Sequence, residues 1–493
     1  MTHASSPRIH GLNRAPVRPD RAFVLYWMVA HRRLGWNFAL DRAVSRAVEL
    51  GLPLVILEAL RGDYPWASDR LHAFALQGMH EHAERLRGGP VAYHPFVEPM
   101  HGAGKGLLEA LSRRAALVVT DLFPAFFLPR MLAAAGEKLD VRLEAVDANG
   151  LLPLSVTTGP FTAAVHFRRF LQKRLGSHLL EMPSPDPLDG SGLRPAPPLP
   201  EDVLSRWPAA PAAMLRAESD ALARLPVDHT IPPAGTRGGT AAARRRLARF
   251  LDERIHRYAE ERNHPDAEAA SGLSPYLHWG HLSAHEVFDA LARREEWSPA
   301  RLGAQADGKR HGWWGMGRPA EAFLDQLVTW RELGFVHCHH VPGYNRYESL
   351  PEWARATLEE HATDPRPYVY DLEELAAGRT HDDLWNAAQR ELLVDGTIHN
   401  YLRMLWGKKI LEWTRHPREA LDVMIELNNR YALDGRDPNS YSGIFWTLGR
   451  FDRGWPERPV YGKVRTMTSQ SARRKLDLEG YLARWGSQPS LSV

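Results

Sequence analysis

Two short stretches carry residue types that could bind a metal or a phosphate. HCHH at 337–340 offers metal ligands, but ligands at consecutive positions do not converge easily on one ion, and Cys338 is the only cysteine. GAGKG at 102–106 has the glycines and lysine of a phosphate loop, but Gly106 stands where serine or threonine should follow the lysine. We therefore predict neither a metal site nor a phosphate loop.

Tryptophan spacing is the more informative pattern. In RMLWGKKILEW, residues 403–413, Trp406 and Trp413 are seven residues apart, which is two helical turns and about 10 Å along one face. Core packing is the usual explanation of such a pair. However, 12 of the 16 tryptophans lie from Trp279 onward, which is more than a core normally needs.

Positive charge gathers near the C-terminal end, although the net charge is only +3. The segment from Arg450 to Arg484 contains nine lysines and arginines but only four acidic residues. A solvated face explains this excess as well as a phosphate-binding surface does.

The bulk properties describe an ordinary globular protein. A chain of 493 residues, 44% hydrophobic and 25% charged, is too long for one hydrophobic core. It has no apolar run of the ~20 residues that a membrane helix needs. The polar N-terminus, residues 1–20, does not read as a secretory signal. We expect a monomeric cytoplasmic protein without a membrane segment.

Hydrophobic periodicity divides the chain into two kinds of structure. Buried strands are predicted at 22–29, 52–60 and 115–123, with helices at 36–51 and 70–89. That order predicts a parallel, Rossmann-like sheet wrapped by helices. The domains we predict are an α/β domain at 22–150, a proline-rich connector or linker at 151–240, and an all-α domain at 241–486.

The helical part resembles one family throughout its length. The chain is similar to class II cyclobutane pyrimidine dimer photolyases, of the photolyase/cryptochrome family, in the stretches SGLSPYLHWGHLSA (271–284), YVYDLEELAAGRTHDDLWNAAQ (368–389), HNYLRMLWGKKILEWT (399–414), LNNRYALDGRDPNSYSGIFW (427–446) and RPVYGKVRTM (458–467). YWMVAHRRLGWNFAL, residues 26–40, is similar to the first strand and helix of that family. The resemblance implies a light-driven DNA-repair lyase with an antenna-type N-terminal domain.

Flavin binding follows from the resemblance. The family holds FAD in its helical domain, where Arg403 matches the arginine along the isoalloxazine ring and Asn428 the asparagine facing flavin N5. Asp434 and Asp437 resemble the acidic pair near the ribityl chain, although DGRDPN is also ordinary turn chemistry. For the pyrophosphate the expected residues are Ser271, Leu273 and Ser274, with a helix that starts after Leu273. An antenna chromophore of the deazaflavin or folate type is possible, without assignable residues.

The resemblance also gives the tryptophans a role. Class II enzymes reduce photoexcited flavin through three tryptophans, and the matching positions are Trp385, Trp406 and Trp413. Electron transfer between indoles requires short distances.

The expected partner is UV-damaged DNA with the lesion flipped out of the duplex. Trp330 and Trp446 match the tryptophans that hold the dimer, and Met404 matches a methionine packing against it. Arg465 resembles the arginine that enters the vacated duplex. The basic tail would then contact phosphates along the bent strand.

One departure affects the substrate site. Gln326 stands where the family has a glutamate that hydrogen-bonds the thymine carbonyl and stabilises the dimer radical anion. An amide still donates a hydrogen bond but supplies no proton. Three hypotheses follow: repair of cyclobutane dimers, a cryptochrome-like photoreceptor, or repair of a different lesion.

Overall fold

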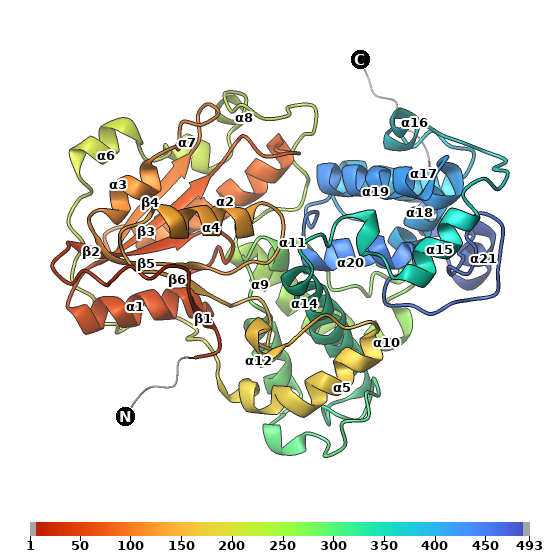
Figure 1. Cartoon of the computed structure of the whole chain (residues 1–493), viewed down its shortest axis with the longest axis horizontal. Coiled ribbons are helices and arrows are strands. Elements are labelled where there is room, and N and C mark those ends of the chain that lie inside the picture. Colours follow the sequence, from red (N-terminus) through yellow and green to blue (C-terminus); the bar gives the residue numbers. More distant parts are fainter. Residues whose placement is uncertain (1–5, 487–493) are drawn as a thin grey trace. The chain divides into compact units, whose positions relative to one another are not determined.

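The structure is a computed structural model that describes residues 6–486 (Figure 1). Its contacts separate two compact units, and neither is one uninterrupted stretch of chain. Unit 1 comprises 1–158, 174–245 and 273–294, and unit 2 comprises 159–173, 246–272 and 295–493. None of the described helices combines the length and apolar character needed to cross a bilayer. The predicted division at 22–150, 151–240 and 241–486 stays a prediction.

A mostly parallel sheet forms the centre of unit 1. Within residues 6–486 its strand order is β1-β6-β5-β2-β3-β4, and only the edge pair β1–β6 is antiparallel. The strands are β1 (Ile9–Gly11), β2 (Phe23–Met28), β3 (Leu54–Leu60), β4 (Ala92–Val97), β5 (Ala115–Asp121) and β6 (Leu143–Val146). The predicted runs became β2, β3 and β5, which confirms the α/β character of this part.

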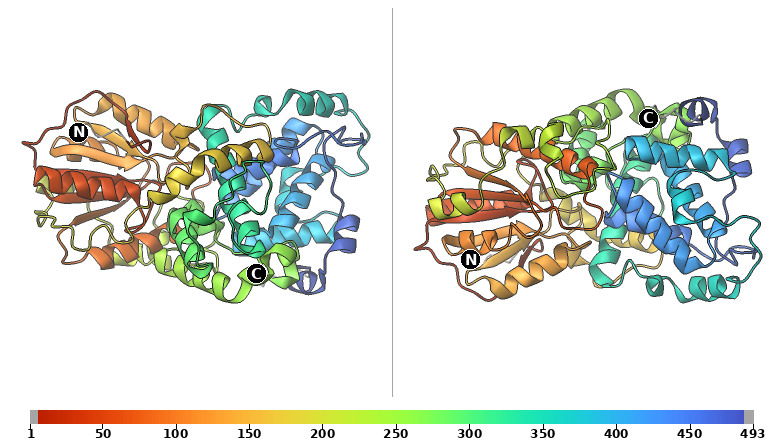
Figure 2. Two further views of the ribbon diagram at one scale, coloured as in Figure 1. Left: turned by 90° about the horizontal axis from the view of Figure 1, so that it is seen from below. Right: turned by 90° about the horizontal axis from the view of Figure 1, so that it is seen from above.

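Helices cover both sides of this sheet, as the two views of Figure 2 show. Helix α1 (Phe38–Leu50) begins at Asn37, whose side chain accepts hydrogen bonds from two backbone N–H groups, and ends at Gly51 with φ of 64°. Its apolar face packs on β2, β3 and β5 in one buried core. The other helices of unit 1 are α2 (Asp69–Leu86), α3 (Leu107–Ser112), α4 (Leu128–Lys138), α6 (Glu201–Arg206), α7 (Ala212–Leu215), α8 (Ser219–Leu222), α11 (Ser274–His278) and α12 (Ala284–Arg294), with 3₁₀ turns η1 (Leu154–Val156) and η2 (Leu175–Leu180).

The proline-rich segment differs from the extended connector that its composition suggested. Residues 174–245 belong to unit 1, where α6 contacts α3, and α7 and α8 contact α2. Trp207 is buried and donates a hydrogen bond from Nε1 to the Ala103 carbonyl at 2.9 Å. The GAGKG loop is also bound by Glu98, which accepts from the Gly104 N–H at 3.1 Å. This loop therefore has a structural role.

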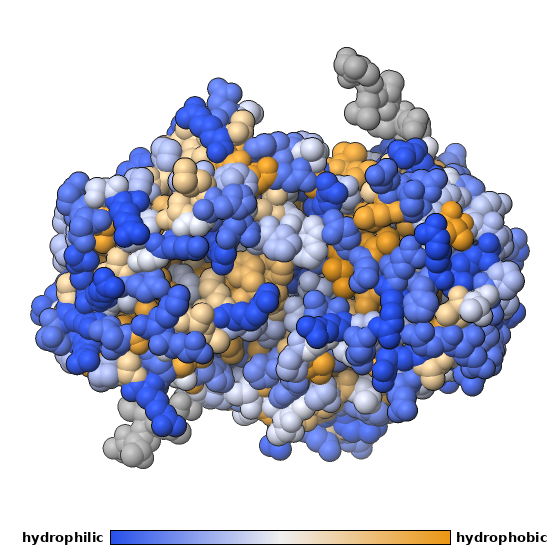
Figure 3. Space-filling model, turned by 45° about the horizontal axis from the view of Figure 1, so that its top comes forward, coloured by the Kyte–Doolittle hydropathy of each residue, from blue (hydrophilic) through white to orange (hydrophobic). Residues whose placement is uncertain are grey.

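Unit 2 is built from helices, as predicted. They are α10 (Tyr258–Glu261), α13 (Arg318–Leu324), α14 (Arg331–His340), α15 (Glu352–Glu360), α16 (Leu372–Ala376), α17 (Asp383–Asp395), α18 (Asn400–Trp413), α19 (Pro417–Tyr431), α20 (Pro438–Thr447), α21 (Ser469–Lys475) and α22 (Glu479–Trp485), while α5 (Ala164–Arg174) and α9 (Thr240–Arg249) cross the boundary between units. Residues 246–486 also contain the π-helices η3 (Phe250–Arg254) and η7 (Asp325–Trp330) and the 3₁₀ turns η4 (Ile255–Arg257), η5 (Pro265–Ala267), η6 (Pro299–Arg301) and η8 (Tyr347–Ser349). On the face drawn in Figure 3 hydrophilic residues predominate and hydrophobic residues surface in separate patches.

Candidate functional site

The three tryptophans predicted to carry electrons form one connected group in unit 2. The rings of Trp385 and Trp406 are parallel within 1°, with centroids 6.4 Å apart. Trp413 meets Trp385 edge-on at 5.6 Å. Trp385, on the neighbouring helix α17, therefore joins the two indoles of α18. The path between Trp406 and Trp413 passes through a second helix and does not run along one helix face.

Hydrogen bonds hold the first two indoles in place. Trp385 donates from Nε1 to the Trp406 carbonyl at 3.0 Å, and Trp406 donates to Oε1 of the buried Gln389 at 2.9 Å. Helix α17 begins at Asp382, whose carboxylate accepts the Trp385 N–H at 3.1 Å. Because all three tryptophans are at most 2% exposed, solvent does not reach the rings directly.

Aromatic contacts continue from Trp413 toward the surface. Tyr370 meets Trp413 edge-on at 5.5 Å, and its hydroxyl lies 2.6 Å from Nδ1 of His381. Tyr368, which is 49% exposed, stacks on His381 at 3.7 Å. The buried tryptophans are thus connected to solvent through other aromatic rings.

A polar cluster lies one helical turn before Trp406. Arg403 donates to the Asp434 carboxylate at 2.9 and 3.3 Å, which ties α18 to the segment between α19 and α20. Asn428, on α19, is buried and donates from Nδ2 to Ser440 at 2.9 Å. Arg403 and Asn428 therefore belong to helices that pack together, and Asp434 lies in the segment that joins α19 to α20.

The connection between α19 and α20 is a turn, as its residue types predict. Asp437 caps α20 by accepting the Asn439 N–H at 2.8 Å, and Pro438 takes the first helical position. Gly435 passes so close to α19 that a Cβ atom there would lie 2.7 Å from the Asn428 carbonyl. Turn chemistry and a cofactor role for Asp437 are therefore compatible.

The predicted pyrophosphate residues fall on both sides of the boundary between units. Ser271 belongs to unit 2, where its carbonyl accepts from Arg246 Nε at 3.0 Å. Leu273 and Ser274 belong to unit 1 and begin α11, which carries Pro275 in its first turn. The structure thus divides this predicted group between two units.

Gln326 and Trp330 lie in the π-helix η7. They are its two partly exposed residues, whereas the other four are buried. Asp325 next to Gln326 accepts a hydrogen bond from Arg168 Nε at 2.8 Å, and both partners of this ion pair are buried. Gln326 is therefore the polar side chain that η7 leaves partly open to solvent.

Trp446 stands among cations at the end of α20. Arg465 lies 5.5 Å and Lys408 lies 5.1 Å from the centroid of its ring. Arg465 also stacks 4.0 Å from the Trp455 ring and donates to Asp452 at 2.8 and 3.1 Å. Burial raises the pKa of Asp452, but the hydrogen bonds from Arg465 and the Arg453 backbone outweigh it, so that the net pKa is lowered.

The other predicted lesion contact, Met404, lies on α18. Its terminal methyl is 3.6 Å from the point where a Cβ on Gly443 of α20 would be. Met404 and Trp446 thus belong to adjacent helices, and both are partly exposed.

Sequence reasoning missed several residues that contact the predicted ones. Gln389 binds Trp406, Asp452 binds Arg465, and Lys408 approaches Trp446. Gln389 follows Trp385 by four residues, a spacing that places both on one face of α17. A lysine within an apolar helical stretch was the available signal for Lys408.

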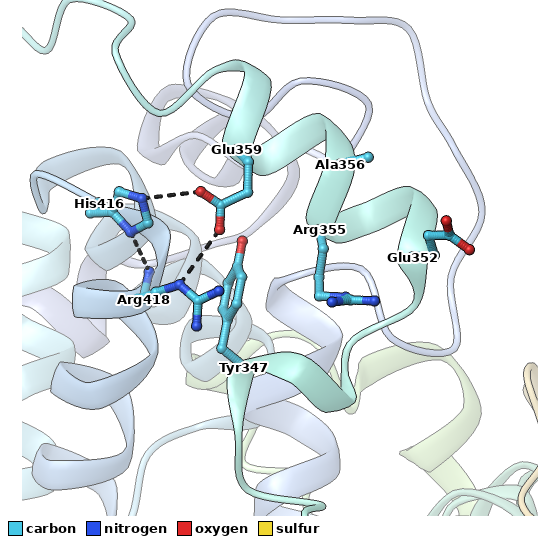
Figure 4. Close-up of a pocket in the computed structure, with 7 residues that line it drawn as sticks. All are labelled: Tyr347, Glu352, Arg355, Ala356, Glu359, His416 and Arg418. Atoms are coloured by element: carbon cyan, nitrogen blue, oxygen red, sulfur yellow. Dashed lines mark hydrogen bonds and ion pairs between the residues drawn. The ribbon is translucent and has the colours of Figure 1, made fainter.

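A separate open pocket of unit 2 has no predicted site residue in its walls (Figure 4). Glu359 lies 3.2 Å from His416 and 3.6 Å from Arg418, and Arg418 also forms an ion pair with Glu348. The Arg418 guanidinium also stacks 4.3 Å from the centroid of the Tyr347 ring. We assign no function to this pocket.

Comparison with known proteins identifies close relatives. A deoxyribodipyrimidine photo-lyase of Methanothermobacter thermautotrophicus is 34% identical over 493 residues, which is 98% of this chain and 98% of its own length. One of Oryza sativa subsp. japonica is 35% identical over 476 residues, covering 93% of this chain and 87% of its own. No protein-family model matches the chain.

Solved structures agree on the fold. A class III photolyase from Agrobacterium tumefaciens and a cryptochrome from Synechocystis both superpose with a TM-score of 0.65 over 94% of this chain. The superposed regions make up 86% of the Agrobacterium chain and 88% of the Synechocystis chain. Both are 18% identical to this chain in sequence, so they support the fold alone. Because full-length relatives exceed 30% identity and the architecture is shared, this chain belongs to the photolyase/cryptochrome family.

Proposed function

We propose that this protein repairs cyclobutane pyrimidine dimers in DNA by light-driven electron transfer from reduced FAD, as a class II photolyase. The continuous contact from Trp406 through Trp385 to Trp413, beginning one helical turn from Arg403, carries this proposal. Its relatives named deoxyribodipyrimidine photo-lyase support the reaction. The partner we propose is UV-damaged DNA. We also propose that the protein is a cytoplasmic monomer.

The residues of unit 2 fit the polar edge of a flavin. The Arg403–Asp434 pair is largely buried, and the Asn428 amide is oriented by Ser440. Such fixed polar groups suit a ring that is apolar on its faces and polar along one edge. Asp437 would lie near the ribityl chain. Ser271, Leu273 and Ser274 would bind the pyrophosphate, with hydroxyl and backbone N–H groups as donors.

Bound FAD would supply the photoexcited electron donor, and the chain's own residues would do the rest. Trp413, Trp385 and Trp406, in that order, would pass electrons inward from the surface. Their contacts at 6.4 and 5.6 Å keep each transfer short. An antenna chromophore of the deazaflavin or folate type would bind to unit 1.

The lesion would be held by side chains that are partly exposed in unit 2. Trp330, Trp446 and Met404 would pack against the flipped dimer, since aromatic rings stack well on bases. Gln326 would hydrogen-bond a thymine carbonyl through its NH₂ group. Arg465 would fill the gap left in the duplex.

A cryptochrome-like photoreceptor is the second candidate. The observation that favours it is Gln326, because an amide supplies no proton to the lesion. The cryptochrome from Synechocystis has the same fold. Repair of a different lesion is the third candidate, and Gln326 is again the observation that favours it.

Product analysis after illumination separates dimer repair from the other two candidates. Protein purified with FAD, identified by its absorption spectrum and by the cofactor released on heating, is reduced and mixed with an oligonucleotide carrying one thymine dimer. We expect intact thymines in the light and none in the dark. Photoreduction without repair would favour a receptor or another lesion. A protein that cannot be loaded with FAD would end the photolyase proposal.

A further inference from the structure

Lys408 is a buried lysine without an ion pair among residues 6–486. It is 0% exposed, and its Nζ donates one hydrogen bond, to the Thr447 carbonyl at 2.6 Å. Its neighbour Lys409 differs, because that lysine forms an ion pair with Glu412 at 2.8 Å. A buried ammonium group with one hydrogen bond is costly, so the position calls for an explanation.

The charged groups around Lys408 come from two segments. On its own helix Lys409 and Glu412 neutralise each other, and Glu412 also accepts from the Tyr461 hydroxyl at 3.0 Å. On the segment after α20, Asp452 and Arg465 act on Lys408 with opposite signs. Burial lowers the pKa of Lys408 to about 7, with Asp452 raising it and Arg465 lowering it.

Asp452 therefore acts electrostatically on Lys408 while it is hydrogen-bonded to Arg465. Arg465 holds it with two hydrogen bonds, at 2.8 and 3.1 Å. Both Arg465 and Lys408 also lie near the Trp446 ring, at 5.5 and 5.1 Å. If Arg465 leaves Asp452, Lys408 loses a repelling neighbour and gains an uncompensated carboxylate. Both changes favour its protonated form.

We propose that Lys408 is a positioning residue that takes up a proton when Arg465 moves from Asp452 onto damaged DNA. The neutral Nζ amine binds one proton from solvent and becomes an ammonium group. This charge compensates Asp452 and keeps a cation beside Trp446. The inference rests on the proposed function, in which Arg465 enters the duplex and Trp446 contacts the lesion.

The proton balance gives a test. A dimer-containing duplex is titrated into the protein by calorimetry between pH 6 and pH 9, in two buffers with different ionisation enthalpies. Below about pH 7 Lys408 is already charged, so little uptake is expected. Above it, up to one proton should bind per complex. As the pH increases through this range, the dissociation constant of the DNA complex should rise, in total about tenfold for each unit by which DNA binding raises the pKa of Lys408.

Two variants separate this idea from a merely structural role. Lys408→Met keeps the length of the side chain and should abolish proton uptake, flattening the pH profile. Lys409→Met removes a neighbouring charge and should leave uptake as in the wild type. Lesion-selective binding by the wild type without proton uptake above pH 7 would overturn the inference alone, and needs no variant. Binding without preference for the lesion would instead contradict the proposed function.

Discussion

At the scale of single residues, the position of Trp385 changes the expected electron path. Two indoles on one helix suggested transfer along α18, but Trp385 of α17 lies in contact with both. Helical spacing defines neighbours on one helix and contains no information about a ring supplied by another. The resemblance included Trp385 in the set of three, and packing supplies the order of contact on which the proposed order of transfer rests.

Trp385→Phe should nearly abolish photoreduction of bound FAD, because phenylalanine fills the space but is much harder to oxidise. The lost hydrogen bond to the Trp406 carbonyl should lower the free energy of unfolding by about 1 kcal/mol. Absorbance during blue-light illumination measures the reduction, and thermal unfolding the stability. Trp353→Phe, outside the group of three, is the matched control. Equal rates of FAD photoreduction in both variants would indicate that the three tryptophans serve only in core packing.

Gln326→Glu tests the departure in the substrate site. If dimers are repaired, the acid should raise the repair yield per absorbed photon. A partly buried carboxyl can hold a proton near neutral pH and stabilise a radical anion. Because a protonated carboxyl can also transfer its proton to the radical anion, which an amide cannot do, the gain should be several-fold.

The measurement is thymine released per photon, with FAD binding and photoreduction as internal controls. The adjacent Asp325 should not interfere, since it is paired with Arg168. A lower yield would indicate a pocket arranged around the amide, and would make another lesion or a receptor role the leading hypothesis.

At the scale of elements, the long apolar patterns correctly predicted buried strands, whereas short or irregular elements were not predicted. The predicted strands at 22–29, 52–60 and 115–123 enclose β2, β3 and β5, because continuous apolar runs mark buried parallel strands. Strands β1, β4 and β6 were missed. Two of them have three or four residues, and β4 contains His94 and Pro95. The π-helix η7 also has no pattern of its own, since it differs from an α-helix only in hydrogen-bond register.

The last helix, α22, offers a test of pH-dependent stability. Tyr481 on α22 donates to Glu391 at 2.7 Å, and the His399 N–H donates to the same oxygen at 3.1 Å. Burial raises the pKa of Glu391 from 4.5 to about 7, against these two hydrogen bonds. The unfolded chain therefore releases this proton at lower pH than the folded one. Stability from this group should fall as the pH rises from about 4.5 to about 7.

Glu391→Gln should remove this dependence, because the amide keeps both hydrogen-bonding functions of a protonated carboxyl and cannot ionise. Above pH 7 the variant should be more stable than the wild type, by at most about 3 kcal/mol. Denaturant unfolding at pH 5 and pH 8 measures the difference. A variant destabilised equally at both values would mean that Glu391 is ionised throughout.

At the scale of the whole molecule, composition predicted an α/β part followed by a helical part, and packing decided the units. Residues 159–173 join unit 2, and 273–294 join unit 1. Long-range contacts decide such exchanges, and local periodicity does not encode them. The same holds for the site, where Gln389 and Lys408 lie within matched stretches and Asp452 does not, and none of the three was predicted as a partner of the site residues. Residues within a matched stretch were predictable, and their contacts across helices were not.

The proposed DNA binding depends on many side chains at once, and the affinity should fall as the salt concentration rises. Exposed cations follow α20, among them Arg453, Arg458, Lys463, Arg474 and Lys475. If about five of them contact phosphates, affinity should fall by about 10²–10³-fold between 50 and 200 mM salt. Binding isotherms on intact and dimer-containing duplexes measure this dependence.

Arg465→Ala should act on the damaged duplex selectively. Its side chain lies between Asp452 and the Trp455 and Trp446 rings, so its proposed role is in the gap and not along the backbone. Preference for the dimer should therefore fall more than affinity for intact DNA. Arg474→Ala, on exposed α21, should weaken binding to both duplexes about equally and reduce the salt slope by about one contact. If Arg465→Ala behaves like Arg474→Ala, this arginine contacts phosphate only, and another side chain must fill the vacated duplex.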